Sequence, residues 1–560
     1  MKLRFWLFFA VLAAILLAFQ SYITLNIPRW DDFHGILIPV DILINGETVA
    51  EKIEILFSQN NEHRIAVDRL VLLLLTYLSP SGIAEMKTLA LSGTLLLVAL
   101  GALFVQTGRK LKLSYIQLLP IPIVLFSTHV WEILQSLMVP YQVFAVLFMS
   151  FISFYLASKG KSIAILILIS TIAIFCHGNG LLTIPIVGLI LILNARYKDL
   201  LIWAIFSISI VAFYFTNYVT PPWNNNVSPL ENPLASILYF FEFIGSFTLA
   251  SINLSESLNT SVLAKALPTI FGLLLFGGFL FIFYKNYLKG SKLKTNLEKL
   301  KNNELDTFLI ACLMFLFATG LMMALKRTGF PMNSRYVINS QLVFIIVYLF
   351  ISSKIQSKKL NIAVLTTSIL YYCLCLFNYT AISLSVKEAA IVDVYNWKNN
   401  RIWLSQYTDY TQTYHLNEVL DKTYNKGLYK FPENIFDNLN EAMVSSDTTS
   451  LDINYDGKVL SVATQDTERG LFKNNIQKYI MLKSAKSTYI MHFDYHKNGL
   501  GSILEEKDYF NNNINTRIYT ELIPKGIYQI ALVQFIEGKL VIIPTNQTLT
   551  NNNDTTPIRI

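Results

Sequence analysis

Long apolar runs that recur along the first two thirds of the chain constrain its fold more than any other sequence feature. A bilayer core about 30 Å thick requires roughly 20 apolar residues per helix. Eleven segments of the 560-residue chain meet or approach that length. They lie at about 5–25, 88–107, 114–128, 138–157, 162–176, 180–194, 200–218, 263–284, 307–325, 337–353 and 361–383. The sequence therefore predicts a polytopic α-helical membrane protein, in which residues 1–384 form the membrane domain.

The first apolar run allows two interpretations. Lys2 and Arg4 before an apolar stretch are typical of a signal peptide. The run is long, however, and no small-residue cleavage site follows before Trp30. We therefore expect a retained helix.

Basic residues are unevenly distributed among the loops between the apolar runs. Alternate loops, starting with the amino terminus, contain 18 of the 27 Lys and Arg residues of positions 1–384. The opposite set of loops contains 13 of that region's 17 acidic residues. Because Lys and Arg accumulate in cytoplasmic loops, we expect a cytoplasmic amino terminus and, after eleven spans, a tail outside the cytoplasm. The sequence pI near 9.0 does not indicate nucleic-acid binding, since the basic excess lies among membrane spans.

Residues 385–560 differ in composition and predict a soluble extracytoplasmic α+β domain. A helical stretch is expected at 386–445, and strands at 457–463, 477–482, 487–496 and 515–522. A hairpin, 526–534 and 539–544, would turn at Glu537-Gly538, and the Asn/Thr-rich stretch 546–556 is expected to be a frayed end. No cysteine occurs in this tail, so it must fold on its own core.

The first outer loop, about 26–87, begins with an acidic pair directly after the first helix. Asp31 and Asp32 lie between Trp30 and Phe33. Two adjacent carboxylates at a membrane surface are costly to desolvate, and one could serve as a general base. The alternative is an interfacial aromatic beside a solvated acidic turn.

Further along the same loop, Glu62, His63 and Arg64 precede an apolar run. Residues 62–78 predict an amphipathic helix at the interface, and the density of polar groups at its start favours a binding function. The alternative is a surface helix whose charges meet lipid headgroups.

The loop between the ninth and tenth runs contains Lys326, Arg327 and Arg335, followed by Tyr336. Three outer cations break the positive-inside bias and require an anion, which a lipid-linked phosphate would supply. The alternative is contact with lipid headgroups or with the acidic residues of the first loop. His177 and Asn179 flank Gly178, where the backbone could approach a ligand closely, although such a loop is more often a helix cap.

One further segment and the absence of known motifs complete the sequence reading. Segment 234–250 is moderately apolar without a cytoplasmic partner span, so we expect it to be interfacial or re-entrant. The chain has no Walker loop, no GxSxG and no HExxH, so an ATP-driven pump is unsupported.

With these residues the membrane part resembles the C-type (GT-C) glycosyltransferase superfamily. The resemblance covers about 1–384 and rests on Asp31-Asp32 after the first helix, the long outer first loop and the outer cations. The runs 61–64 and 334–336 add weaker similarity.

The resemblance implies a donor sugar on a polyprenyl-phosphate carrier and a glycan acceptor such as O-antigen, or a protein acceptor, at a bacterial inner membrane. Asp31 or Asp32 would be the base. Arg327, Arg335, Lys326, Arg64 and His63 would hold the phosphate, while Glu62, Tyr336, His177 and Asn179 would line the substrate site. No cofactor is required, although His34 and Glu62 leave a divalent metal ion open.

Two other functional classes compete with this one. A transporter of lipid-linked sugars or of a polysaccharide predicts charged or broken helices near the midplane and polar groups on both faces. A non-catalytic envelope scaffold predicts no requirement for Asp31 or Asp32 together with Arg327 or Arg335.

Overall fold

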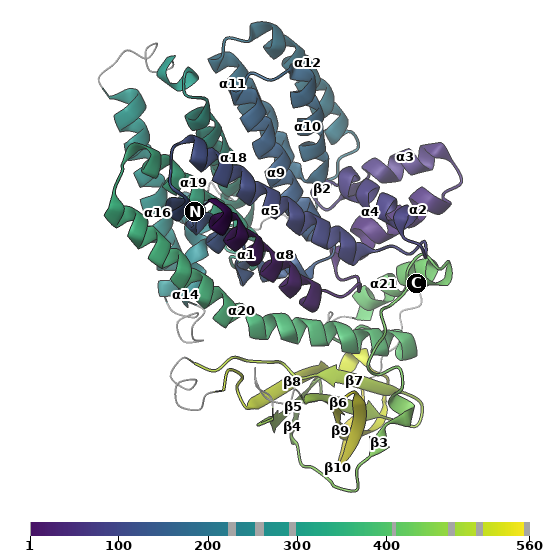
Figure 1. Cartoon of the computed structure of the whole chain (residues 1–560). Coiled ribbons are helices and arrows are strands. Elements are labelled where there is room, and N and C mark those ends of the chain that lie inside the picture. Colours follow the sequence, from purple (N-terminus) through teal and green to yellow (C-terminus); the bar gives the residue numbers. More distant parts are fainter. Residues whose placement is uncertain are drawn as a thin grey trace. The chain divides into compact units, whose positions relative to one another are not determined.

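The computed structural model describes residues 2–221, 231–252, 262–289, 298–405, 410–468, 476–499 and 508–553. It divides into two compact units (Figure 1). The first unit comprises 1–21, 42–75 and 86–376, and the second comprises 22–41, 76–85 and 377–560. The sequence predicted a single boundary, between residues 384 and 385. In the structure the second unit begins at residue 377 and also includes 22–41 and 76–85, from the region around the first loop. Each unit is described below by itself.

The first unit is a helical bundle. Its long elements are α1 (Lys2–Ile23), α5 (Met86–Lys110), α9 (Val139–Ser158), α10 (Ile163–Cys176), α11 (Thr183–Leu193), α12 (Tyr197–Phe215), α13 (Pro233–Gly245), α16 (Leu263–Phe283), α18 (Glu304–Arg327), α19 (Val337–Lys354) and the first part of α20 (Lys358–Asn400). Ten helical elements of the described ranges are long and apolar enough to cross a membrane, which indicates a multi-pass membrane protein.

The third predicted span is built from short pieces. Helices α6 (Tyr115–Leu118), α7 (Pro120–Leu125) and α8 (Trp131–Gln135) form it together with the 3₁₀ turn η2 (Thr128–Val130). Pro120 and Pro122 lack a backbone N–H, so they interrupt the helical hydrogen-bond ladder. The whole element extends over 115–135, which is longer than the expected span 114–128.

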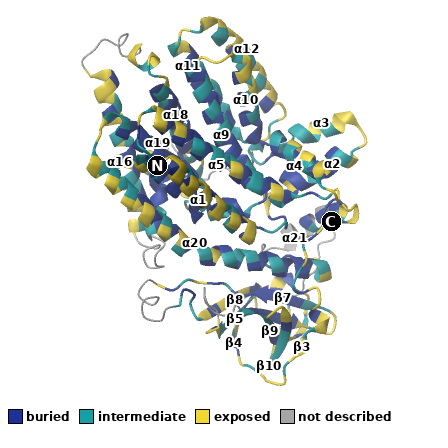
Figure 2. Cartoon of the chain, in the orientation of Figure 1, coloured by how far each residue is buried: buried dark blue, intermediate teal, exposed yellow. Residues whose placement is uncertain are grey.

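The burial of the helices separates central from peripheral positions (Figure 2). In the most apolar 18-residue stretch of the element that contains α19, 83% of the residues are buried. The corresponding share for α12 is 11%. Peripheral α12 exposes large apolar side chains, among them Ile202, Ile205 and Ile208. Apolar side chains exposed on a long helix are expected where it faces lipid.

The first loop supplies the only described strands of this unit. It contains α2 (Ile38–Asn45), α3 (Val49–Phe57), the two-residue strands β1 (Gln59–Asn60) and β2 (His63–Arg64), and α4 (Ala66–Leu78). The prediction of a helix over 62–78 is therefore wrong at its start. Asn61 adopts a positive φ of 50°, and the resulting turn pairs β1 with β2 before the helix begins.

Contacts between the helix termini define the two ends of the bundle. At the first, the β1–β2 hairpin contacts 177–182, 214–219 and the end of α18, and we call this the hairpin end. At the opposite end, Lys159 pairs with Glu304, Arg196 donates to the Lys161 carbonyl and Tyr348 bonds Asn361. Helices α10 and α11 are shorter than the other spans, yet each connects the two ends.

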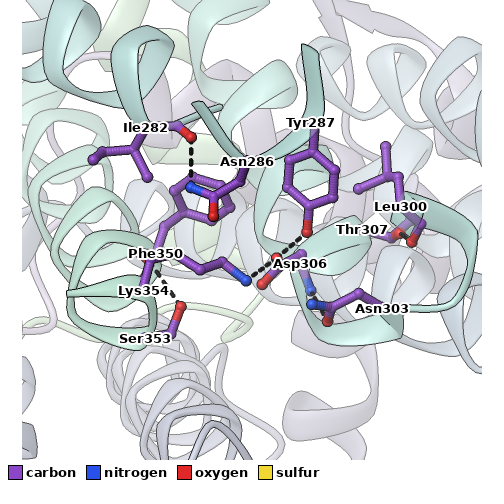
Figure 3. A network of polar contacts seen from close by, with 10 residues as sticks. All are labelled: Ile282, Asn286, Tyr287, Leu300, Asn303, Asp306, Thr307, Phe350, Ser353 and Lys354. Atoms are coloured by element: carbon purple, nitrogen blue, oxygen red, sulfur yellow. Dashed lines mark hydrogen bonds and ion pairs between the residues drawn. The ribbon is translucent and has the colours of Figure 1, made fainter. Parts of the chain in front are cut away.

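A buried polar network holds three helix ends together at the opposite end (Figure 3). Asp306 near the start of α18 is fully buried. One of its carboxylate oxygens pairs with Lys354, at the end of α19, and accepts the hydroxyl of Tyr287 in the π-helical turn η5 (Tyr284–Leu288). Asn303 caps α18 by accepting the Asp306 backbone N–H at 3.2 Å. These contacts compensate a buried carboxylate through one of its oxygens, while the other oxygen has no hydrogen-bond partner among the described residues.

Helix α13 with η4 (Ser246–Thr248) and α14 (Leu249–Ile252) packs against α16, α18 and α19. By length and composition the element 233–251 could cross a membrane. Its first turn contacts Thr328, just beyond α18, and its last residues contact Ser340, in the first two turns of α19. Both contacted positions lie toward the hairpin end. That the segment is interfacial or re-entrant stays a prediction.

The second unit combines helices with two β-sheets. A five-stranded sheet has the order β3 (Met443–Val444), β10 (Lys539–Asn551), β9 (Gly526–Ile536), β6 (Gln477–Lys483), β7 (Thr488–His492). A three-stranded sheet has the order β4 (Asp452–Tyr455), β5 (Val459–Gln465), β8 (Asn513–Tyr519). All neighbouring strands are antiparallel except β3 and β10, which are parallel.

Strand β6 shows how the sequence builds three layers. Ile480 and Leu482 pack into a core shared with the three-stranded sheet, whereas Tyr479 and Met481 pack against Val392 of α20 and neighbouring side chains. Alternate residues of a strand point to opposite faces, so a strand apolar on both faces is buried between two layers. The predicted strands and the Glu537-Gly538 turn are confirmed, with ends shifted by a few residues.

Two predictions about the tail need correction. Residues 546–551 continue β10 past an irregularity between Pro544 and Gln547, where Asn546 adopts a positive φ of 56°. The Asn551 amide donates to the Thr520 and Ile523 carbonyls, so this stretch is anchored up to that residue, and 554–556 lie outside the described residues. The expected helical region 386–445 contains the end of α20 and α21 (Tyr410–Asn425), but 428–441 is mostly irregular.

Candidate functional site

The turn of the β1–β2 hairpin presents the predicted residues Glu62 and His63 at the hairpin end. Gln59 pairs with Arg64 and Asn60 with His63, which leaves Asn61 and Glu62 in the turn. Asparagine tolerates the left-handed conformation better than most residues, so the sequence Asn61-Glu62 suits a two-residue connection. The hairpin thereby presents two of the predicted site residues on a short element.

Arg64 anchors the hairpin to α12. Its Nε donates to the Tyr214 carbonyl at 2.6 Å, and its terminal nitrogens donate to the carbonyls of Phe57 and Thr216. The last carbonyls of a helix lack intrahelical donors, and the guanidinium satisfies two near the end of α12. Most of the donors of this predicted phosphate ligand are therefore occupied by the chain itself.

His63 stacks on His177, the residue that follows α10. Their ring centroids are 3.8 Å apart, with an interplanar angle of 33°. The Gly178 N–H donates to His63 Nδ1 at 3.3 Å, and the Asn179 N–H donates to His177 Nδ1 at 3.2 Å. A nitrogen that accepts a hydrogen bond carries no proton, so each neutral ring has its N–H at Nε2.

Burial and neighbouring charges keep these imidazoles neutral. Desolvation lowers the pKa of His63 to about 4, and the positive charges of Lys326 and Arg327 add to the effect. Desolvation also lowers the pKa of His177 well below its ordinary value, with a further contribution from His63. The pair therefore offers Nε2–H donors without a fixed positive charge at neutral pH.

Two cations at the end of α18 complete this cluster. Arg327 forms an ion pair with Glu62 at 3.3 Å, and both side chains are partly accessible, at 28% and 16%. Lys326 is exposed. Cations at the carboxyl end of a helix interact favourably with its dipole. The sequence left open that these cations contact acidic residues of the first loop instead of a phosphate. The Arg327–Glu62 pair is such a contact.

The other predicted cation occupies a neighbouring place in the same unit. The backbone N–H of Arg335 donates to the Glu132 carboxylate at 3.0 Å, and its guanidinium lies over the Tyr336 ring at 5.3 Å. Tyr336 in turn contacts Phe243 of α13, with ring centroids 6.5 Å apart. Arg335 and Tyr336 therefore lie beside α13, and Glu132 supplies a second compensating acid.

The acidic pair belongs to the second unit, and its two members differ. Trp30 adopts a positive φ of 47°, which creates a tight turn. Asp32 is buried and accepts the Arg29 N–H at 3.0 Å, so it stabilises that turn. Asp31 is exposed, and its carboxylate forms no hydrogen bond or ion pair within the described ranges.

Apart from Arg335 and Tyr336 beside α13 and the anchoring Arg64, the predicted residues form two groups. Glu62, His63, His177, Asn179, Lys326 and Arg327 gather at the hairpin end of the first unit. Asp31 and Asp32 lie in the second unit, which is described separately. Tyr218 also reaches the first cluster, because its hydroxyl donates to the Glu62 carbonyl at 3.4 Å.

Neither a metal site nor a known relative adds to this picture. In the part of the chain that the structure describes, no three His, Cys, Asp or Glu side chains are grouped so as to hold a metal ion. No family model, curated protein or solved structure matches the chain.

Proposed function

We propose that this protein is an inverting glycosyltransferase that transfers a sugar from a polyprenyl-phosphate carrier to an envelope glycan or protein acceptor. The proposal places its hairpin end on the outer face of a bacterial cytoplasmic membrane. Eleven crossings with a re-entrant α13 agree with the excess of basic residues at the opposite end and with the sorting of helix-end contacts.

The observation that carries the proposal is the donor-rich cluster of Lys326, Arg327, His63 and His177. Arg327 is partly accessible and only loosely paired, at 3.3 Å, so a phosphate can engage its free donors. The Nε2–H groups of the histidine pair add neutral donors. A departing polyprenyl phosphate gains negative charge, and preorganised donors stabilise that charge as it forms.

Asp31 fits the role of general base better than Asp32 does. Its carboxylate is exposed and unpaired in the described residues, whereas Asp32 holds the Arg29 turn. In the reaction Asp31 takes the proton of an acceptor hydroxyl as that oxygen bonds to the anomeric carbon. The bond from this carbon to the phosphate oxygen breaks, and the phosphate leaves with the electron pair.

A complementation assay tests the proposal. A deletion strain would receive wild type, Asp31→Asn, Asp32→Asn or Arg327→Ala at matched membrane expression, and surface glycans would be followed by mass spectrometry. We expect Asp31→Asn and Arg327→Ala to accumulate normally but to lose one sugar. Asp447→Asn and Lys301→Ala alter exposed residues and serve as controls. Full restoration by both aspartate variants would overturn the catalytic proposal.

Transport is the second candidate, because the Asp306–Lys354 pair is a buried charged group at the opposite end of the bundle. A transporter would require polar groups at both ends. It predicts that Asp306→Asn removes the surface sugar as completely as Arg327→Ala does, and that the lipid-linked sugar accumulates on the inner leaflet. A transferase with a structural Asp306 pair predicts a donor that still reaches the outer leaflet.

A further inference from the structure

Helix α13 is held against the hairpin end by contacts at two points on one face. Ser236 and Thr328 join their hydroxyl groups at 3.2 Å, one residue beyond Arg327. Two turns later Phe243 contacts Tyr336. Tyr239 lies between these points, three residues after Ser236 and four before Phe243. Residues at these spacings share one helix face, so Tyr239 faces the region of Arg327 and Tyr336.

Close backbone packing fixes the position of α13. A Cβ atom added at Gly245 would lie 1.9 Å from the Pro268 carbonyl oxygen, and one added at Gly272 would lie 1.9 Å from the Phe241 carbonyl oxygen. Only glycine at both places allows α13 and α16 to approach so closely. The face that carries Tyr239 is therefore held rigidly.

The Tyr239 hydroxyl is buried but unused. The residue is 5% exposed, and its oxygen has no hydrogen-bond partner among the described residues. Arg327, Tyr336 and Glu242 are near enough to interact with it electrostatically. A buried hydroxyl without a partner costs stability, which is expected where a group is kept for a ligand.

We propose that the Tyr239 hydroxyl donates a hydrogen bond to a phosphate oxygen of the polyprenyl-linked substrate, beside Arg327. This inference rests on the proposed function and makes α13 a third wall of the phosphate site, in addition to the hairpin and the end of α18. A phosphate suits the position because it accepts bonds from the hydroxyl and from Arg327 together.

Glu242 provides an independent check on the charge of the ligand. It lies one turn after Tyr239 on α13, is half-buried, and interacts electrostatically with Lys265. An anion bound beside Tyr239 is repelled by this carboxylate, so Glu242→Gln tightens its binding. A cation would instead be held by Glu242, and the same variant would then weaken binding.

Binding of undecaprenyl phosphate to the purified full chain, followed by native mass spectrometry, tests the inference. Inorganic phosphate and phosphatidylglycerol are the parallel probes, which distinguish a free phosphate and a general headgroup from the polyprenyl carrier. We expect Tyr239→Phe to weaken undecaprenyl phosphate binding about tenfold, because a hydrogen bond to a charged group is lost. Tyr284→Phe, at an exposed tyrosine, should leave binding unchanged.

The outcomes separate this inference from the proposed function. Unchanged binding by Tyr239→Phe, while Arg327→Ala binds weakly, overturns the role of Tyr239 alone. Unchanged binding by both variants overturns the phosphate site as a whole. A thermal melt excludes a merely structural role, since removing an unpartnered hydroxyl should leave Tyr239→Phe at least as stable as wild type. A marked loss of stability would contradict the inference.

Discussion

Acidification should open the hairpin end, because His63 accepts a hydrogen bond at the nitrogen that acid would protonate. In the closed hairpin the pKa of His63 is about 4, against 6.5 for an exposed imidazole. The opened state therefore binds this proton at a higher pH than the closed state does. The closed state has its full stability above about pH 6.5 and loses it as the pH falls toward 4.

The expected magnitude follows from the difference between the two pKa values. A difference of about 2.5 units corresponds to about 300-fold in the opening equilibrium, or about 3 kcal/mol, as an upper limit. His63 keeps part of its surface accessible to solvent, so screening reduces this figure. His177, whose pKa is also lowered, adds to the same loss.

Hydrogen exchange measures this opening directly. The amide groups of Gly178 and Asn179 are the donors to the two imidazoles, so the peptide that contains them reports the closed state. Its exchange rate, divided by the intrinsic rate at each pH, should rise between pH 6.5 and 4 in wild type and far less in His63→Asn. The exposed His496 provides the control His496→Asn. The same pH dependence in wild type and His63→Asn would refute the reasoning.

Three further substitutions have defined outcomes. Gly178→Ala places a Cβ 2.8 Å from His63 Nδ1, so we expect about 1–3 kcal/mol of local destabilisation, seen as faster exchange of the same peptide. Lys354→Met leaves the buried Asp306 carboxylate without its cation, so melting in detergent should show a loss of about 3–5 kcal/mol in stability. A second change, Asp306→Leu, should largely recover this loss. Equal losses in the single and double variants would contradict a buried ion pair. Asn551→Ala removes two amide donors to main-chain carbonyls, so limited proteolysis of the full chain should cut its tail faster, with about 1–3 kcal/mol lost, and an unchanged rate would mean that the end of β10 is not anchored by them.

The helices and strands could be read largely from the sequence because each depends on local periodicity. Apolar runs of sufficient length identified most spans, and alternation with a Glu537-Gly538 turn identified the β9–β10 hairpin. The errors occurred where a single backbone angle redirected the chain. Asn61 turned an expected helix start into a strand pair, and the irregularity at Asn546 allowed β10 to continue.

The residues of the candidate site were named from their chemistry, but their tasks depend on partners far away in the chain. The sequence shows Arg64 only as a cation. In the fold it holds the hairpin to the end of α12, since it donates hydrogen bonds to the Tyr214 and Thr216 carbonyls. Tyr239 gave no signal, because an aromatic residue in an apolar segment is ordinarily part of the packing. What distinguishes it is a buried hydroxyl that has no hydrogen-bond partner among the described residues.

The sequence by itself determined that the chain is a multi-pass membrane protein with a strand-rich tail, because hydropathy and alternation act over a few turns or a few residues. The tertiary structure decided which polar groups meet: His63 on His177, Arg327 on Glu62, and the face of α13 beside Tyr336. Such contacts join residues from separate helices, and their free energy arises from packing geometry, which the order of residues along one segment does not contain.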